Sequence, residues 1–287
     1  MKKILFTGGT GFLGRNLVPV LSEKYNVISP TRMDLNLKNL DGLEAFIKNN
    51  NFDVIIHAAI PNLAFNKDSK ETFLRDSLTT FLKLHQLQEC YGKMIYFGSG
   101  AEFDKSVPIV NISEMDFGLR IPETDYGLSK YIMNLLCRES KNIYNLRIFG
   151  CYGPTDAHFK LITYVIRCCL KNEPIYLHQN CKFDYMLVTD LFPVLDYFIE
   201  NTPKYHDYNV CTGRSVELLE ICRIIQKELN SSVPVHIEQA GFNKEYSGNN
   251  QRIFQEIPNL CFTPLLQGIR EQILWEKEQI VYEKKSI

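Results

Sequence analysis

The chain has 287 residues, of which 45% are hydrophobic and 23% charged, and its formal net charge at pH 7 is −1. That length is enough to bury a substantial core, and the near-neutral charge gives no electrostatic basis for binding nucleic acid or an anionic membrane. The nine cysteines are scattered, with no C-x-x-C pair and no clustered histidines, which predicts neither a disulfide framework nor a metal site. No apolar run is long enough to span a bilayer, so we expect a cytoplasmic globular protein.

Short apolar runs alternate with longer segments of helical periodicity in the first half of the chain. The runs read as buried strands: "KILFTG" at 3–8, "NVIS" at 26–29, "DVIIHAA" at 53–59, "KMIYFGS" at 93–99 and "NLRIFG" at 145–150. Candidate helices lie between them, near 12–24, 40–50, 71–91 and 124–141. This alternation predicts right-handed βαβ units and the α/β class, with a Rossmann-type doubly wound parallel sheet.

The alternation loosens after "YGP" at 152–154, where proline and polar residues become more frequent. Helices are expected near 157–172, 190–200 and 215–229. We expect residues 1–155 and 182–211 to form the Rossmann domain, and residues 156–181 and 212–287 to form a smaller C-terminal lobe. The final segment, "EKEQIVYEKKSI", reads as the solvated end of a helix.

The sequence "FTGGTGFLGR" joins the first expected strand to the first expected helix. Its glycines Gly8, Gly11 and Gly14 form G-x-x-G-x-x-G, a variant of the dinucleotide fingerprint. Glycine is required where the strand turns sharply, where backbone touches a pyrophosphate and where the helix packs on the sheet. The start of the helix then offers free N–H groups to the phosphates. The loop therefore predicts that the Rossmann domain binds a dinucleotide.

The end of the second strand indicates which dinucleotide. In an NAD site, an acid about 20 residues after the glycine loop holds the ribose 2′-OH. Here the strand end reads "VISPTRMDLNL", which places Thr31 and Arg32 at that point. Because an arginine pairs with a 2′-phosphate, the sequence favours NADP (NADPH). In the alternative, Arg32 is a solvated loop residue, Asp34 holds the ribose and the cofactor is NAD.

The stretch "DYGLSK" places Tyr126 four residues before Lys130, a spacing that none of the other tyrosines shares. With the glycine loop in front of it, the chain resembles the extended short-chain dehydrogenase/reductase family, in its nucleotide-sugar branch of NAD(P)-dependent epimerases and dehydratases. The resemblance implies a catalytic set of Ser99, Tyr126 and Lys130, with Ser99 in "YFGSGAEFD". Further similarities are "HAA" at 57–59, "LRIFGCYGP" at 146–154, "FDYMLVTDL" at 183–191 and "YNVCTG" at 208–213.

The resemblance also implies contacts with cofactor and substrate. Tyr126 and Lys130 are expected to touch the cofactor as well as the reacting group. The other cofactor contacts implied by the family pattern are Thr10, Phe12, Leu13, Thr31, Asn36, Leu37, Ala58, Ala59 and Ile148, beside the three glycines and Arg32. Those implied for the substrate are Ala101, Glu102, Lys182 and Arg252.

The chemistry of ketone reduction explains these residue types. Hydride transfer to a ketone leaves an alkoxide, which needs a proton donor and a hydrogen-bond partner. A free tyrosine has a pKa near ~10 and is a poor acid or base at neutral pH. We expect the Lys130 ammonium to lower the pKa of Tyr126 and to hold the nicotinamide ribose. Ser99 would orient the carbonyl and share the developing charge.

Within the branch, the stretch "TRMDLNL" resembles the GDP-L-fucose synthases, which epimerise before they reduce. Their epimerising cysteine has Ala101 at its position here, and a contraction around "TDAHF" leaves His158 as the stand-in for their histidine. The Asp-Glu pair of the dehydratases has no counterpart beside "DYGLSK", whose neighbour is Thr124. Phe183, with Lys182 beside it, takes the place of an arginine that grips the substrate diphosphate. These departures favour reduction without epimerisation.

We therefore expect NADPH-dependent reduction of a nucleoside-diphosphate 4-keto-6-deoxy sugar, a hexose or heptose, at carbon 4, in nucleotide-sugar biosynthesis for surface polysaccharide. One alternative is a nucleotide-sugar 4-epimerase with tightly bound NAD, against which Arg32 argues. The other is a non-catalytic dinucleotide-binding protein, against which the set of Ser99, Tyr126 and Lys130 argues.

The expected third and fourth helices carry more apolar residues than one buried face needs. The surplus is in "TFLRDSLTTFLKLHQLQECYG" at 72–92, whose apolar positions are Phe73, Leu74, Leu78, Phe81, Leu82, Leu84 and Leu87, and in "YIMNLLC" at 131–137. An exposed apolar patch of this kind is usually an interface. We expect a homodimer that buries the patch in a four-helix bundle; in the alternative, the second lobe covers it.

Overall fold

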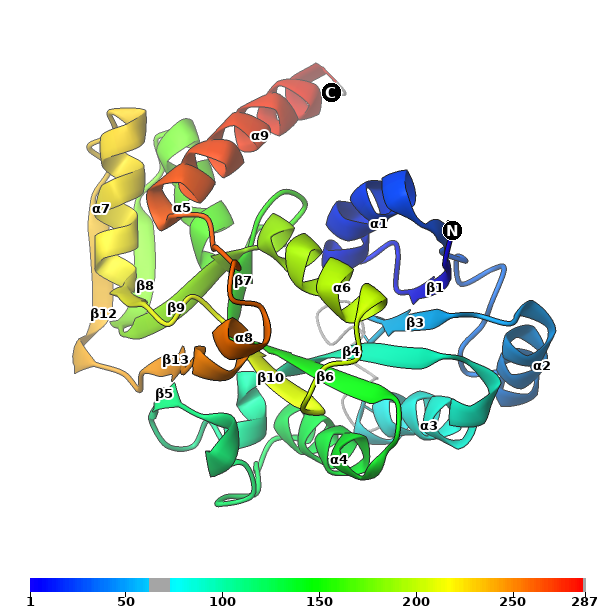
Figure 1. Cartoon of the computed structure of the whole chain (residues 1–287). Coiled ribbons are helices and arrows are strands. Elements are labelled where there is room, and N and C mark those ends of the chain that lie inside the picture. The colour runs from blue at the N-terminus through cyan, green and yellow to red at the C-terminus, as the bar shows by residue number, and fades with distance from the viewer. Residues whose placement is uncertain (62–72, 286–287) are drawn as a thin grey trace.

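A computed structural model of the chain describes residues 1–61 and 73–285 (Figure 1). Its centre is a six-stranded sheet in the order β10-β6-β4-β3-β1-β2, and all neighbouring strands are parallel. The strands are β1 (Lys3–Thr7), β2 (Asn26–Ile28), β3 (Val54–His57), β4 (Lys93–Ser99), β6 (Ile143–Ile148) and β10 (Asp207–Val210). Each of the five predicted strands is present, and β10 adds the sixth.

Helices cover both faces of this sheet. The helices on one face are α1 (Phe12–Lys24) and α6 (Leu191–Glu200), and those on the other are α2 (Leu40–Asn50), α3 (Phe73–Gln86) and α4 (Asp125–Glu139) (Figure 1). The alternation of side chains along β1 explains why both faces need covering. Ile4 and Phe6 are buried with α1 and α6, whereas Leu5 is buried with α2, α3 and α4. The predicted doubly wound α/β class is therefore confirmed.

The predicted helices differ from the observed ones mainly at their ends. The third was predicted over 71–91, of which 71–72 lie outside the described residues. It ends at Gln86, after which the chain tightens into a 3-10 turn, Gln88–Cys90, where Cys90 N–H donates to Leu87 O. The fourth begins at Asp125 because the Thr124 side chain accepts a hydrogen bond from Gly127 N–H and caps the first turn.

A second layer lies beside the carboxyl ends of the central strands. It contains a sheet in the order β11-β9-β13-β5, with β7 paired to β9, and a separate pair, β8 and β12. Its strands are β5 (Ile109–Ile112), β7 (Gly150–Tyr152), β8 (Ile175–Asn180), β9 (Lys182–Leu187), β11 (Ser215–Glu217), β12 (Val235–Phe242) and β13 (Tyr246–Gly248). The helices α5 (Leu161–Lys171), α7 (Leu218–Leu229) and α9 (Leu265–Lys285) pack on a core of their own.

The two expected lobes are interleaved along the chain. β9, expected in the Rossmann domain, pairs with β7, β11 and β13 of the second layer. Conversely, α8 (Gln251–Glu256), expected in the smaller lobe, buries Ile253 in the core of the central sheet. β5 also crosses over, because it pairs with β13. Among the helices of residues 1–61 and 73–285, none has both the length and the apolar character that a membrane span requires.

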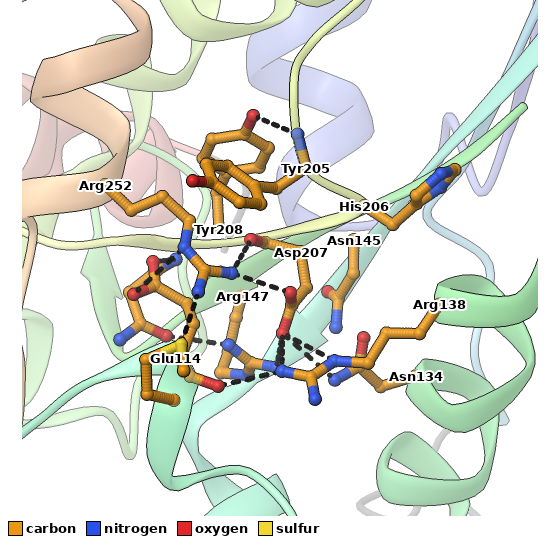
Figure 2. A network of polar contacts seen from close by, with 12 residues as sticks. Glu114, Asn134, Arg138, Asn145, Arg147, Tyr205, His206, Asp207, Tyr208 and Arg252 are labelled. Atoms are coloured by element: carbon orange, nitrogen blue, oxygen red, sulfur yellow. Dashed lines mark hydrogen bonds and ion pairs between the residues drawn. The ribbon is translucent and has the colours of Figure 1, made fainter.

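A buried ion network joins the central sheet to the helices beside it (Figure 2). Arg147 on β6 is 0% exposed, and its guanidinium pairs with Glu102 at 2.9 Å and with Asp207 at 3.0 Å. Asp207, at the start of β10, also accepts Arg138 of α4 at 2.8 Å and Arg252 of α8 at 2.9 Å. These contacts compensate charges that would be costly to bury alone.

We predict that Arg147→Met lowers the free energy of unfolding by about 3–5 kcal/mol, because the Glu102 carboxylate stays buried without its cation. Urea unfolding measures the loss. Lys141→Met is the matched control, since Lys141 pairs with Glu89 at 3.3 Å where both side chains are exposed. The control should cost less than about 1 kcal/mol. Equal losses in the two variants would show that the network does not contribute as described.

Candidate active site

The glycine loop lies where the strand order of the central sheet reverses. β1 has β2 on one side and β3 on the other, so the chain leaves β1 at the switch point where open α/β sheets bind ligands. Gly8 has φ +83°, and a Cβ there would lie 2.7 Å from Ala59 N at the end of β3. A Cβ on Gly14 would lie 2.4 Å from the Gly9 Cα. Both positions therefore require glycine.

The first turn of α1 presents unpaired N–H groups to this crevice. Gly11 is the N-cap and supplies no side-chain hydrogen bond, and the first turn contains no acidic residue. Thr10 and Gly11 are exposed, and Phe12 and Leu13 are half-buried. A helix start of this kind favours a phosphate group. The loop therefore fits the pyrophosphate of a dinucleotide, as expected.

In the loop after β2, the acidic residue Asp34 is hydrogen-bonded within the loop itself. The Asp34 carboxylate accepts hydrogen bonds from the Thr31 N–H at 2.9 Å and the Thr31 hydroxyl at 2.6 Å. These bonds hold the pKa of Asp34 below its usual value. Arg32 is exposed beside it. The next expected contact, Asn36, is exposed and accepts a bond from Lys38 N–H at 3.1 Å.

The remaining expected cofactor residues line the carboxyl ends of neighbouring strands. Ala58 and Ala59 follow β3 next to Gly8, and Ile148 ends β6. Leu37 is half-buried in the loop after β2 and packs against the core under α2 and α3. Ala58, Ala59 and Ile148 therefore lie at the carboxyl ends of strands along one edge of the sheet, whereas Leu37 lies further from its strand, in the loop after β2.

Ser99 and Tyr126 meet in one pocket. Ser99 ends β4, Tyr126 is in the first turn of α4, and both line a pocket of about 270 Å³. The Ser99 hydroxyl accepts a hydrogen bond from Ala101 N–H at 3.2 Å, and its backbone N–H donates to Glu102 at 3.0 Å. The end of β4 is thus fixed by the turn that follows it, which holds the hydroxyl toward the pocket.

Lys130 lies one turn further along α4 and is buried. Its ammonium donates to Phe97 O at 2.7 Å, and burial lowers its pKa to about 8. We expected Lys130 to lower the pKa of Tyr126. Instead, burial raises the pKa of that phenol, and a hydrogen bond with Ser99 opposes the rise. Burial of the phenol outweighs the interactions that favour its ionised form.

A second tyrosine, Tyr246, lies beside Ser99 in the pocket, and the sequence analysis did not predict it. The Tyr246 hydroxyl of β13 lies 3.4 Å from the Ser99 hydroxyl and lines the pocket. The pocket also contains Asp156, whose pKa burial raises to about 6, and Cys151, whose pKa burial raises well above its usual value. Cys151 and Asp156 lie within the stretches "LRIFGCYGP" and "TDAHF", but no motif marks Tyr246, which a segment far away in the sequence brings to the pocket.

Of the expected substrate residues, one lines the pocket and others lie elsewhere. Ala101 lines the pocket. Glu102 is 0% exposed, and its carboxylate accepts bonds from Asn145 and Arg147. Arg252 donates to the Asp207 carboxylate and lies in the network of Figure 2. Glu102 and Arg252 are therefore paired with charged groups inside the fold and do not line the pocket. The sequence could not show that each has a buried partner.

Two further candidates lie outside the pocket lining. Lys182 is exposed at the start of β9, opposite Glu217 of β11. His158 is exposed and is not among the residues that line the pocket. Within the described residues, no group of three or more His, Cys, Asp or Glu could hold a metal ion.

The chain is similar to known proteins over most of its length. Residues 4–211 match the model of the NAD-dependent epimerase/dehydratase family. The chain is 24% identical over 286 residues to ADP-L-glycero-D-manno-heptose-6-epimerase from Brachyspira hyodysenteriae, and 88% of each chain is covered. It is 25% identical over 259 residues to CDP-abequose synthase from Salmonella muenchen, over 82% of this chain and 83% of that one.

Solved structures share the fold. A GDP-L-fucose synthetase from Naegleria fowleri bound to NADP superposes with a TM-score of 0.84 at 17% identity, over 97% of this chain and 93% of that one. The TM-score indicates a common architecture, and at this identity the likeness concerns the fold alone. The fold and the glycine loop together support binding of a nicotinamide dinucleotide.

Proposed function

Because the chain belongs to the NAD-dependent epimerase/dehydratase family of nucleotide-sugar enzymes, we propose that it reduces a nucleoside-diphosphate 4-keto-6-deoxy sugar, a hexose or heptose, at carbon 4 with NADPH. The product would serve nucleotide-sugar biosynthesis for surface polysaccharide. The observation that carries the proposal is the meeting of Ser99 and Tyr126 in one pocket. The relatives are named for an ADP-heptose and for CDP-abequose, so the base of the substrate stays open.

The residues of the pocket have separate tasks in this reaction. The bound nicotinamide supplies the hydride. Tyr126 donates its phenolic proton to the oxygen that gains negative charge, and the high pKa that burial gives the phenol keeps this proton in place until then. The Ser99 hydroxyl donates a hydrogen bond to the same oxygen. Lys130, whose ammonium donates to Phe97 O, would hold the nicotinamide ribose.

The loss of the two epimerising positions supports the proposal of reduction over epimerisation at the carbons next to the ketone. Such epimerisation needs one group to remove a proton from carbon and another to return it. The two positions that correspond to the epimerising groups of the GDP-L-fucose synthases do not supply them here, because Ala101 carries no such group and His158 is exposed outside the pocket lining. A 4-epimerase that retains NAD is the alternative, and net consumption of NADPH separates the two.

Tyr126→Phe should abolish reduction while cofactor affinity changes little, because the variant loses the proton donor and keeps the ring. Acid–base groups contribute ~10²–10⁴-fold, so kcat should fall at least that far. Loss of NADPH absorbance with GDP-, CDP-, UDP- and dTDP-4-keto-6-deoxy sugars measures the rate. Tyr131→Phe on the same helix is the control, since Tyr131 stacks on Phe117 at 4.7 Å. A Tyr126 variant that keeps more than about a tenth of wild-type kcat would contradict the assignment.

The proposed preference for NADP rests on Arg32. Asp34 is engaged with Thr31, so the loop offers the exposed Arg32 to a 2′-phosphate while its own acid is occupied. The cofactor-bound Naegleria fowleri structure contains NADP.

Arg32→Ala should raise the KM for NADPH by roughly ten- to a hundred-fold and leave the KM for NADH nearly unchanged, because only NADPH carries the 2′-phosphate. Initial rates with each cofactor provide the comparison. Lys38→Ala controls for loss of a nearby charge, since Lys38 pairs with Asp76 at 2.6 Å. Equal changes in the KM for both cofactors would show that Arg32 does not recognise the 2′-phosphate.

A homodimer through α3 and α4 is part of the proposal. The two helices lie side by side on one face of the sheet (Figure 1). Much of the predicted surplus is buried within the chain, as Phe81 and Leu84 are 0% exposed. Leu82 on α3 and Leu135 on α4 nevertheless remain 40% and 44% exposed. Large apolar side chains on neighbouring helices suit a two-fold contact.

Sedimentation equilibrium at micromolar concentration should give twice the chain mass of 33.3 kDa. The double variant Leu82→Lys, Leu135→Lys should give the single-chain mass, because it places charges in the contact. Leu274→Lys is the control, since Leu274 on α9 is 64% exposed and distant in the fold from α3. A wild-type chain that sediments as a monomer would refute the dimer.

A further inference from the structure

Two ammonium groups line the pocket that contains Ser99 and Tyr126. Lys105 follows the turn after β4, and Lys160 directly precedes α5. The chain between them is long, so the fold and not the local sequence brings both to one pocket. Neither belongs to the residues that carry out the proposed reduction.

Aromatic rings support Lys105. Its ammonium lies 4.6 Å from the centre of the Tyr246 ring and 5.7 Å from that of Phe183, and the two rings are 5.1 Å apart. Ring faces attract a cation without neutralising it. Among residues 1–61 and 73–285, no carboxylate forms a salt bridge with Lys105 or Lys160. Both therefore keep their positive charge available to a ligand.

The charges in the pocket do not balance. Burial lowers the pKa of Lys105, and the nearby positive charge of Lys160 lowers it further. Among the described residues that line the pocket, Asp156 is the one acid, and burial raises its pKa to about 6. Even with Asp156 ionised, two cations face one carboxylate, which leaves the pocket positive. Like charges held together beside a cavity are stabilised by an anion between them.

The start of α5 adds to this field. Lys160 is the N-cap of that 11-residue helix, makes no side-chain capping bond and is followed by no acidic residue in the first turn. Leu161 and Ile162 of this turn line the pocket. The positive end of the helix therefore acts in the same region as the two ammonium groups.

We propose that Lys105 and Lys160 bind the diphosphate of the substrate, which rests on the proposed function for the identity of that substrate. In a nucleoside-diphosphate 4-keto sugar, the ketone at carbon 4 lies across the ring from the diphosphate at carbon 1. One pocket then has to offer hydroxyl groups to the ketone and cations to the diphosphate. Ser99 and Tyr126 supply the first, and the lysine pair supplies the second. This assignment replaces Lys182, which is not among the residues that line the pocket.

Isothermal titration of ADP, GDP, CDP, UDP, dTDP and inorganic pyrophosphate into the full chain, saturated with NADP+, tests the proposal. Saturation keeps the titrant out of the dinucleotide site. Lys105→Met and Lys160→Met should each weaken the tightest of these ligands by about ten- to a hundred-fold, because each removes one charge-assisted contact and keeps the aliphatic stem. Lys182→Met, the matched control, should change the affinity by less than about twofold.

Charge-retaining variants separate recognition from packing. Lys105→Arg and Lys160→Arg should restore most of the affinity, and thermal unfolding of each variant reports whether it is folded. Unchanged affinity in both methionine variants, or a larger loss in Lys182→Met, would overturn the proposal. A wild-type chain that binds none of the diphosphates would also overturn it. A wild-type chain that binds them through the lysines and reduces no 4-keto sugar would instead contradict the proposed function.

Discussion

A fully buried arginine connects the two elements that carry the proposed catalytic side chains. Arg147 pairs with Glu102, whose carboxylate also receives the Ser99 backbone N–H at the end of β4. Arg147 pairs as well with Asp207, which receives Arg138 from α4, the helix of Tyr126 and Lys130. A buried ion pair adds little net stability, but its geometry is demanding, because a carboxylate that loses its cation is costly. The relative position of β4 and α4 therefore depends on this network.

The rest of the site follows from that arrangement and from the order of the strands. The central sheet reverses its order at β1, which opens a crevice at the carboxyl ends of β1 and β3 beside the start of α1. Ser99 ends the next strand, β4, so a dinucleotide bound on the glycine loop would extend toward it. The second layer then closes the far side with β13 and the start of α5. Under the proposed function, the cofactor, the reacting group and the anionic end of the substrate would thus meet at one edge of the central sheet.

Local patterns in the sequence were sufficient for much of this. Buried parallel strands are almost continuously apolar, so their positions could be predicted, and the glycine loop and the Tyr126–Lys130 spacing are short motifs with a physical cause. Contacts between distant segments could not be predicted. Tyr246 reaches Ser99 across 147 residues, and β5 joins β13 to interleave the lobes. Glu102 and Arg252 were expected at the substrate from the family resemblance, and their charged partners, Arg147 and Asp207, lie in distant segments. The pKa of Tyr126 depends on burial, which no motif encodes.

The central claim is net transfer of hydride from NADPH to carbon 4 of a keto sugar. The most direct measurement uses NADPH deuterated at the transferable position, with nucleoside-diphosphate 4-keto-6-deoxy sugars, and locates the label in the product by NMR and mass spectrometry. The account predicts consumption of NADPH in step with product formation and deuterium at carbon 4 of every product molecule. A sugar that changes configuration without label and without loss of NADPH would identify an epimerase and contradict the account.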